Sequence, residues 1–296
     1  MPFGLRLIDL PIIRRSDALR SFFTAAWLGW QIESNWADPF LFAIYSIARP
    51  IAGVMILVVM YSVITGGATQ QPIFAYIYLG NALYIMVGMV ISGVSWTIID
   101  DREHYRVAKQ LHSAPIHYYY YLMGRGVARF LIGTVSVLIT VGFGIIVFKL
   151  PITWAGTDWL MLLAGFPLGI VVLAAMGLAL GSLTLTMARH FWSVGDAVAG
   201  GLYLFSGAIF PLETLPGWIR PLGFVFPVTY WLEAMRRALL GPSAAGFPTL
   251  AFLSDWQLLG ILAAMTAGWL LVSVWIYRWG LRTARESGML DMETGY

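Results

Sequence analysis

The chain has 296 residues, of which 59% are hydrophobic and only 11% are charged, and its formal net charge is +3. A soluble domain carries about 25% charged residues, so this chain cannot cover itself with polar surface and a membrane protein is indicated. The 18 basic residues gather at the ends of apolar stretches, which is typical of topology signals and argues against a nucleic-acid partner. No cysteine is present, which excludes a disulfide framework and thiolate chemistry.

An amphipathic segment opens the interpretable part of the chain. Charged residues interrupt residues 1–15, so no cleavable signal peptide is expected there. In residues 16–36, apolar and aromatic side chains recur on one helical face, at Leu19, Phe22, Phe23, Ala26, Trp27 and Trp30. With charged residues on the other face, this segment is predicted to be an amphipathic helix lying in the membrane interface. A first helix packed on a soluble partner is the alternative.

Six apolar stretches are each long enough to cross a hydrocarbon core, which takes about 20 residues. They span roughly residues 43–65, 73–99, 127–148, 159–187, 192–211 and 256–278. The chain is therefore predicted to be an all-α polytopic membrane protein, with residues 1–296 forming a single transmembrane domain of six transmembrane helices. Because an Arg deep in lipid is costly, Arg49 is expected near the interface, with the apolar core of the first span after Pro50. Gly177 and Gly181 predict close helix packing in the fourth span.

Basic residues are most frequent in the segments that share one side of the membrane with the N-terminus. On that side they are Arg6, Arg14, Arg15, Arg20, Arg102, Arg106, Lys109, Arg125, Arg129, Arg189, Arg278, Arg282 and Arg285. The positive-inside rule then puts both termini in the cytoplasm. The outer loop that carries Arg220, Arg236 and Arg237 departs from the rule, as long loops often do.

A charged segment, residues 100–115, separates the second and third expected spans. Acidic residues crowd its start, basic residues follow, and Pro115 ends it, an order that suits the dipole of a helix. We predict a short surface helix on the cytoplasmic side here, with a solvated polar loop as the alternative. The run Tyr118–Tyr121 that follows is typical of an interfacial aromatic belt, and contact with a substrate is the other interpretation.

A second, very short inner turn is expected at Arg189 and His190, between the fourth and fifth spans. Asp196 lies about one turn into the fifth span, and an ionisable residue inside a membrane is a candidate functional group. A partner such as Arg189 would equally make Asp196 structural.

Residues 211–240 are predicted to form a broken hairpin before the last span. Prolines at positions 211, 216, 221 and 227 forbid one long helix, since each lacks a backbone donor and clashes with the preceding turn. Trp218, Tyr230 and Trp231 are rings of the kind that lie at the level of lipid headgroups. Irregular backbone at that depth needs cover from protein or from a water-lined cavity, so an extracellular re-entrant hairpin is predicted. An ordinary proline-rich external loop is the alternative.

The hairpin and the turn before it resemble the membrane subunits of type-two ABC exporters. The matching pattern is Ser206-Gly207, Phe210-Pro211, Leu215-Pro216, Trp218, Pro227, Thr229-Tyr230, Glu233 and Arg236. The order of spans is similar over nearly the whole chain. Residues 100–115 also resemble the coupling helix of this family, with Glu103 early and Ala114-Pro115 at the end.

The resemblance implies a permease subunit, a half-transporter that works as a dimer with an identical or related permease in the cytoplasmic (inner) membrane of a bacterium or archaeon. Two copies of a cytoplasmic ABC ATPase would bind ATP and Mg²⁺, so no cofactor and no metal is expected in this chain. The only lysines, Lys109 and Lys149, follow Ala108 and Phe148, so the sequence contains no P-loop, and it contains no His-Glu-x-x-His motif. The exported substrate is expected to be amphipathic: a drug, a lipid or a lipid-linked glycan.

No catalytic residue is expected, and the resemblance implies two functional regions instead. The ATPase-coupling interface would comprise Asp100, Asp101, Arg102, Glu103, Tyr105, Arg106, Arg189 and His190. An external gate in the hairpin would comprise Phe210, Pro211, Glu213, Leu215, Pro216, Trp218, Pro227, Tyr230 and Glu233. The alternatives are an ATP-independent carrier, an intramembrane enzyme, and a membrane anchor or sensor. A coupled carrier usually needs paired carboxylates at the bilayer midplane, and the sequence shows none.

Overall fold

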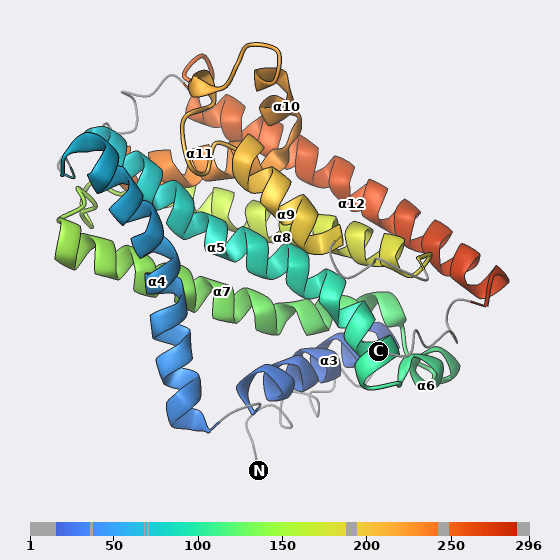
Figure 1. Cartoon of the computed structure of the whole chain (residues 1–296). Coiled ribbons are helices and arrows are strands. Elements are labelled where there is room, and N and C mark those ends of the chain that lie inside the picture. Colours follow the sequence, from blue (N-terminus) through green and yellow to red (C-terminus); the bar gives the residue numbers. More distant parts are fainter. Residues whose placement is uncertain are drawn as a thin grey trace.

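The computed structural model of the chain describes residues 16–35, 38–67, 69, 71–187, 194–241 and 249–288, and all regular elements in these ranges are helical (Figure 1). They are α3 (Asp17–Ser34), α4 (Pro39–Thr65), α5 (Pro72–Ile99), η1 (Asp100–His104), α6 (Ala108–Ser113), α7 (Tyr118–Phe148), α8 (Trp159–Thr184), α9 (Val194–Phe205), η3 (Leu212–Thr214), α10 (Arg220–Val225), α11 (Pro227–Leu240) and α12 (Asp255–Glu286). The all-α prediction is confirmed for this part of the chain. Residues 1–15 and the inner turn expected at Arg189 and His190 lie outside the described residues.

Within the described ranges, five helices are long and apolar enough to cross a membrane. They are Phe40–Thr65, Pro72–His104, Tyr118–Phe148, Trp159–Thr184 and Asp255–Glu286. The stretch predicted as the fifth span contains α9, which has only 12 residues and ends at Phe205. Gly207 follows with a left-handed backbone, φ +75°, so the chain turns away before Phe210. The multi-pass architecture is therefore supported, whereas the count of six spans is not confirmed.

Helix α4 contains both Arg49 and Pro50. The helix begins at Pro39 and continues through Pro50 to Thr65. Arg49 therefore lies about 15 Å along its axis, at a rise of about 1.5 Å per residue. A proline is tolerated inside an apolar helix because neighbouring groups and local adjustments satisfy the freed carbonyl. At about 40 Å, α4 is longer than a hydrocarbon core of about 30 Å, so the place of Arg49 near the membrane interface stays a prediction.

Helix α5 lies at the centre of the bundle and packs against α4, α7, α8, α9 and α11 (Figure 1). Small residues on α8 allow its close approach. A Cβ on Gly177 would lie 3.0 Å from Val94 Cβ, and one on Gly181 would lie 2.9 Å from Ile98 Cδ1. The packing role predicted for these two glycines is therefore confirmed.

Helix α3 packs on α7 (Figure 1). Its buried positions are Ser21, Ala25 and Gly29, each four residues from the next. A Cβ on Gly124 of α7 would collide with the carbonyl oxygen of Phe22, so the two backbones touch. The aromatic residues of the predicted apolar face are half-buried or exposed. The small residues therefore fix α3 to the bundle, while its aromatic side chains stay accessible to lipid.

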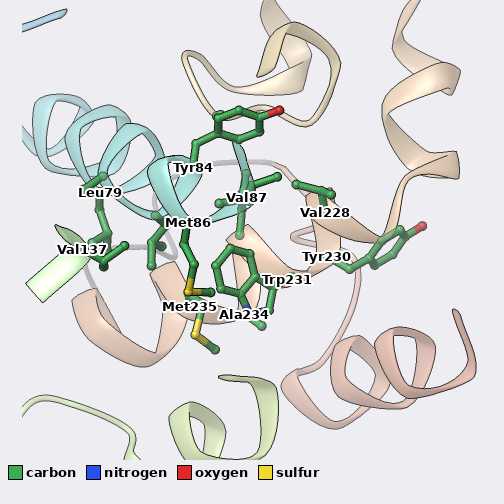
Figure 2. Packing of buried hydrophobic residues seen from close by; sticks show 14 of the residues in the cluster. Leu79, Tyr84, Met86, Val87, Val137, Val228, Tyr230, Trp231, Ala234 and Met235 are labelled. Atoms are coloured by element: carbon green, nitrogen blue, oxygen red, sulfur yellow. The ribbon is translucent and has the colours of Figure 1, made fainter. Parts of the chain in front are cut away.

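Helix α11 is a short helix enclosed by long ones. Twelve of its 14 residues are buried. Trp231 lies against Gly169 of α8, where a Cβ would collide with the indole ring. Figure 2 shows Trp231 and Met235 of α11 in one apolar cluster with Met86 and Val87 of α5. Tertiary packing against two long helices therefore holds α11 in place.

The prolines of the hairpin start short helices as well as ending long ones. Pro211 precedes η3, Pro221 lies in the first turn of α10, and Pro227 begins α11. The start of a helix suits proline because its missing N–H would have no intrahelical partner there. Residues 211–240 are thus broken as predicted, into three short helices. That they re-enter the membrane stays a prediction.

The charged segment 100–115 is divided and is not one surface helix. Asp100–His104 continue α5 as a π-helical turn, η1, and only Ala108–Ser113 form a separate helix, α6. The break includes Arg106, whose φ of +54° lies in the left-handed region. Asp101 and Arg102 are buried, so tertiary contacts hold η1 at the end of α5. The expectation of a single helix over residues 100–115 is corrected accordingly.

Candidate functional site

A groove of about 870 Å³ lies among α4, α5, α7 and α9, with Glu33 of α3 also in its wall. A second cavity, of about 320 Å³, shares the lining residues Gly53, Ile85 and Ala199 with it, so the two cavities are adjacent. Gly53 on α4 and Gly88 on α5 face open space, because a Cβ on either would meet no atom within 4 Å. These glycines therefore keep the groove wide. Sequence reasoning missed them, although a glycine inside an apolar helix costs stability and calls for a reason.

One part of the groove is aromatic. The ring centroids of Tyr84 and Tyr203 are 4.7 Å apart. The Tyr203 hydroxyl donates a hydrogen bond to Asn81 Oδ1, and the Tyr84 hydroxyl donates one to the carbonyl oxygen of Ala199. Because these polar atoms already bond to one another, this part of the groove offers a ligand mainly ring faces and apolar surface.

The larger part of the groove is lined by four ionic side chains: Glu33, Arg49, Arg129 and Asp196. Glu33 and Arg129 form an ion pair, with 2.6 Å between Oε1 and Nε. Burial raises the pKa of Glu33, while the guanidinium groups of Arg129 and Arg125 act in the opposite direction. Arg49 and Asp196 are exposed, and neither has an ion-pair partner among the described residues. The structure thus places Asp196, which the sequence singled out, in the wall of the groove.

The residues expected to couple to an ATPase divide by exposure. Asp101 and Arg102 are buried, with 1% and 5% of their surfaces exposed. Asp100 and Glu103 are half-buried, whereas Tyr105 and Arg106 are exposed. A partner chain could therefore reach the tip at Tyr105 and Arg106, while Asp101 and Arg102 contact this chain itself.

The buried end of η1 is held by α7. The Tyr121 hydroxyl donates a 3.2 Å hydrogen bond to Asp101 Oδ1. Arg125, one turn further along α7, is also buried. Arg102 Nε donates a 2.9 Å hydrogen bond to Glu103 Oε1. Sequence reasoning treated Arg125 and Arg129 as topology signals, and their spacing of four residues indicates only that both lie on one face of α7.

A second polar cluster fixes the hairpin, and Arg236 of α11 is its centre, with 1% of its surface exposed. Its Nε donates a 3.1 Å hydrogen bond to the carbonyl of Tyr76, and its Nη2 donates to the carbonyls of Gly207 and Ala208 at 2.7 and 3.2 Å. The guanidinium carbon also lies 3.8 Å from the centroid of the Tyr76 ring. Gly80 makes room, because a Cβ there would collide with Arg236 Nη2.

Glu233, one turn earlier on α11, joins the same cluster. Its Oε2 accepts a 2.9 Å hydrogen bond from the Tyr76 hydroxyl, and its Oε1 accepts a 3.1 Å hydrogen bond from Arg237 Nε. Burial raises the pKa of Glu233, and the neighbouring guanidinium groups of Arg236 and Arg237 oppose that shift. Arg237 also forms a 2.9 Å ion pair with Asp255 at the start of α12. α11 is thus tied to α5, to the end of α9 and to α12.

The remaining residues of the expected gate separate into an inner and an outer set. Pro211, Leu215, Pro227 and Tyr230 are buried, Phe210 and Glu213 are half-buried, and Pro216 and Trp218 are exposed. Glu213 Oε2 accepts a 2.6 Å hydrogen bond from the Thr249 hydroxyl, which links the hairpin to the connection before α12. Among these residues, Trp218 is the large side chain turned outward, with 81% of its surface exposed.

The fold and these sites define a multi-pass helical membrane protein with a groove in its bundle and a firmly anchored hairpin. A model of the ABC-2 type transporter family matches residues 21–240, and the chain belongs to that family. It is a type-two ABC permease, as the resemblance predicted. In two strains of Mycobacterium tuberculosis (CDC 1551 / Oshkosh and ATCC 25618 / H37Rv), a similar protein is described as a probable doxorubicin resistance ABC transporter permease protein, DrrC. Each is 24% identical over 221 residues, which cover 71% of this chain and 75% of the relative.

Proposed function

We propose that the chain is the permease subunit of an ATP-driven exporter that moves an amphipathic substrate along the groove between α4, α5 and α9. The observation that carries this proposal is the pair of adjacent cavities, one with an ionic lining and the other with an aromatic lining, kept open by Gly53 and Gly88. An amphipathic molecule can match both parts at once. The relatives' link to doxorubicin resistance supports a drug-like substrate.

The energy source would be a separate ABC ATPase in two copies, which binds ATP and Mg²⁺. The exposed tip at Tyr105 and Arg106 is the surface we assign to it, with α6 beside it. Buried Asp101 would pass the motion of the tip to α7 through its hydrogen bond with Tyr121, and η1 would pass it to α5, which it continues. In this proposal the tip and both termini face the cytoplasm of a bacterium or archaeon.

A second permease, identical or related, would complete the path across the cytoplasmic membrane. The hairpin at 211–240 would close its outer end. Because α11 is buried and anchored on three sides, we assign the gating movement to the outer set around Trp218 and not to α11.

Co-purification tests this function. The chain would be expressed with the ABC ATPase encoded beside its gene, purified by a tag on the permease, and placed in lipid nanodiscs. We expect a complex of two permeases with two ATPases that shows vanadate-sensitive ATP hydrolysis. A permease that purifies without an ATPase under every nucleotide condition would contradict the proposal and favour an autonomous carrier.

A further inference from the structure

Among the described residues, the groove contains one cation, Arg49, and one anion, Asp196, that form no ion pair. Glu33 and Arg129 neutralise each other at 2.6 Å. Asp196 lies in the first turn of α9, where the positive end of the helix dipole favours a carboxylate. Among the described residues, Arg49 has neither an acidic partner nor a helix end beside it.

The side chain of Arg49 is exposed and lines the groove. An ionised group on an apolar helix is costly unless it is paired or hydrated. The groove supplies room for water or a ligand next to it. The hydroxyls of Ser46 and Ser92 line the same space, and neither has a hydrogen-bond partner among the described residues. Arg49 and the two serines therefore offer hydrogen-bond donors to a ligand in the groove.

We propose, building on the proposed function, that Arg49 binds the anionic head group of the amphipathic substrate. A planar guanidinium can bond two oxygens of a phosphate or carboxylate at once, and the two serine hydroxyls can donate further hydrogen bonds. The apolar body of the substrate extends past Gly53 toward the rings of Tyr84 and Tyr203, because that glycine lines both cavities. The substrate class is an amphipathic anion, with a phosphate or carboxylate head.

A binding experiment on the permease alone tests this assignment. The purified chain in phosphatidylcholine nanodiscs would be titrated with a fluorescent carboxylate probe, 11-(dansylamino)undecanoate. Competition with dodecyl phosphate, inorganic phosphate and dodecyltrimethylammonium would then separate the head-group charge from the apolar tail. We expect dodecyl phosphate to displace the probe and the other two competitors to fail.

Variants connect the binding to the groove. Arg49→Gln should weaken probe binding by about tenfold, the loss of one charge-assisted pair of hydrogen bonds, and Arg49→Lys should recover much of it. Gly53→Leu should abolish binding by filling the groove. Arg282→Gln is the matched control, because Arg282 is an exposed cation on α12 that does not line the groove. It should bind the probe as the wild-type chain does.

Several results would overturn the assignment. An unchanged probe affinity in Arg49→Gln would contradict an anion site at Arg49. Competition by dodecyltrimethylammonium as strong as that by dodecyl phosphate would contradict it as well. Competition by inorganic phosphate as strong as that by dodecyl phosphate would show that the site does not need an apolar tail, which would contradict an amphipathic ligand. The binding assay contains no ATPase, so anion binding without ATP-driven transport would refute the proposed function alone. Full transport with no anion binding would refute this inference alone.

Discussion

Two arginines, Arg236 on α11 and Arg49 on α4, show opposite ways of accommodating a cation on a helix. Arg236 is almost wholly buried, and three backbone carbonyls accept its hydrogen bonds. Arg49 is exposed to the groove and has no ion-pair partner among the described residues. In the first arrangement, the chain itself supplies the hydrogen-bond acceptors of the guanidinium, so the residue stabilises the fold. The second leaves the guanidinium to water or a ligand, and therefore suits binding.

The largest effect is expected from Arg236→Met. It leaves the carbonyls of Tyr76, Gly207 and Ala208 buried without their donor, so the free energy of unfolding should fall by about 3 kcal/mol. Thermal unfolding in detergent, followed by size-exclusion chromatography, would measure the loss. Arg49→Gln is the matched comparison and should unfold at the wild-type temperature. Equal unfolding temperatures for Arg236→Met and Arg49→Gln would contradict the claim that only Arg236 stabilises the fold.

Two glycines on α5 test the same difference between the packed cluster around Arg236 and the open groove, because replacing either by alanine adds a single methyl group. Gly80→Ala should cost about 2 kcal/mol, because its Cβ would collide with Arg236 Nη2. Gly88→Ala should be neutral or slightly stabilising, because it faces open groove and alanine favours the helix. Parallel melting curves would decide, and a Gly80→Ala protein as stable as Gly88→Ala would show that Arg236 is free to move.

We expect the exposed residues after η1 to contribute to ATPase binding but not to the free energy of unfolding of the permease. Tyr105→Ala is expected to weaken ATPase binding by about tenfold, as loss of one good aromatic contact does, without changing the unfolding temperature. Tyr120→Ala is the control, since Tyr120 on α7 is similarly exposed, 44% against 41% for Tyr105. Surface plasmon resonance with the nanodisc-embedded permease would measure both. If the two variants bound the ATPase equally well, the tip would not be the docking surface.

The smallest effect is expected at the half-exposed pair of Glu33 and Arg129. Glu33→Gln should change the free energy of unfolding by only about 0.5 kcal/mol at neutral pH, because solvent screens the attraction between the two charges. Burial raises the pKa of Glu33, so the folded state binds a proton there more readily than the unfolded state. This group's contribution to stability is therefore lost as pH rises through the raised pKa, and Glu33→Gln should flatten that part of the pH profile. A profile unchanged by the substitution would rule out Glu33 as its source.

The sequence predicted much of the fold, because its signals were local. Prolines 211, 216, 221 and 227 indicated the breaks of the hairpin, and three short helices are found there. Residues 100–115 were predicted less well, because the end of α5 is decided by the contact of Asp101 with Tyr121, 20 residues away. A charge pattern along one segment contains no information on such a contact.

The candidate sites were harder to predict than the helices. The hairpin pattern pointed to Glu233 and Arg236, but the partners of Arg236 are backbone carbonyls, one of them 160 residues away, which no residue type signals. The groove depends on the absence of side chains at Gly53 and Gly88, and the sequence shows only that glycines are present. The place of Arg49 near the membrane interface, which its neighbour Pro50 indicates, stays a prediction.

The most direct test of the account is transport with the groove filled. Proteoliposomes with the permease and its ATPase would be assayed for ATP-driven movement of a fluorescent amphipathic anion, using wild type, Gly53→Leu and Gly268→Leu. Both glycines face open space, but Gly268 of α12 does not line the groove, and light scattering would check that each complex keeps two permeases. The account predicts that Gly53→Leu stops transport and Gly268→Leu does not. Full transport by an intact Gly53→Leu complex would contradict it.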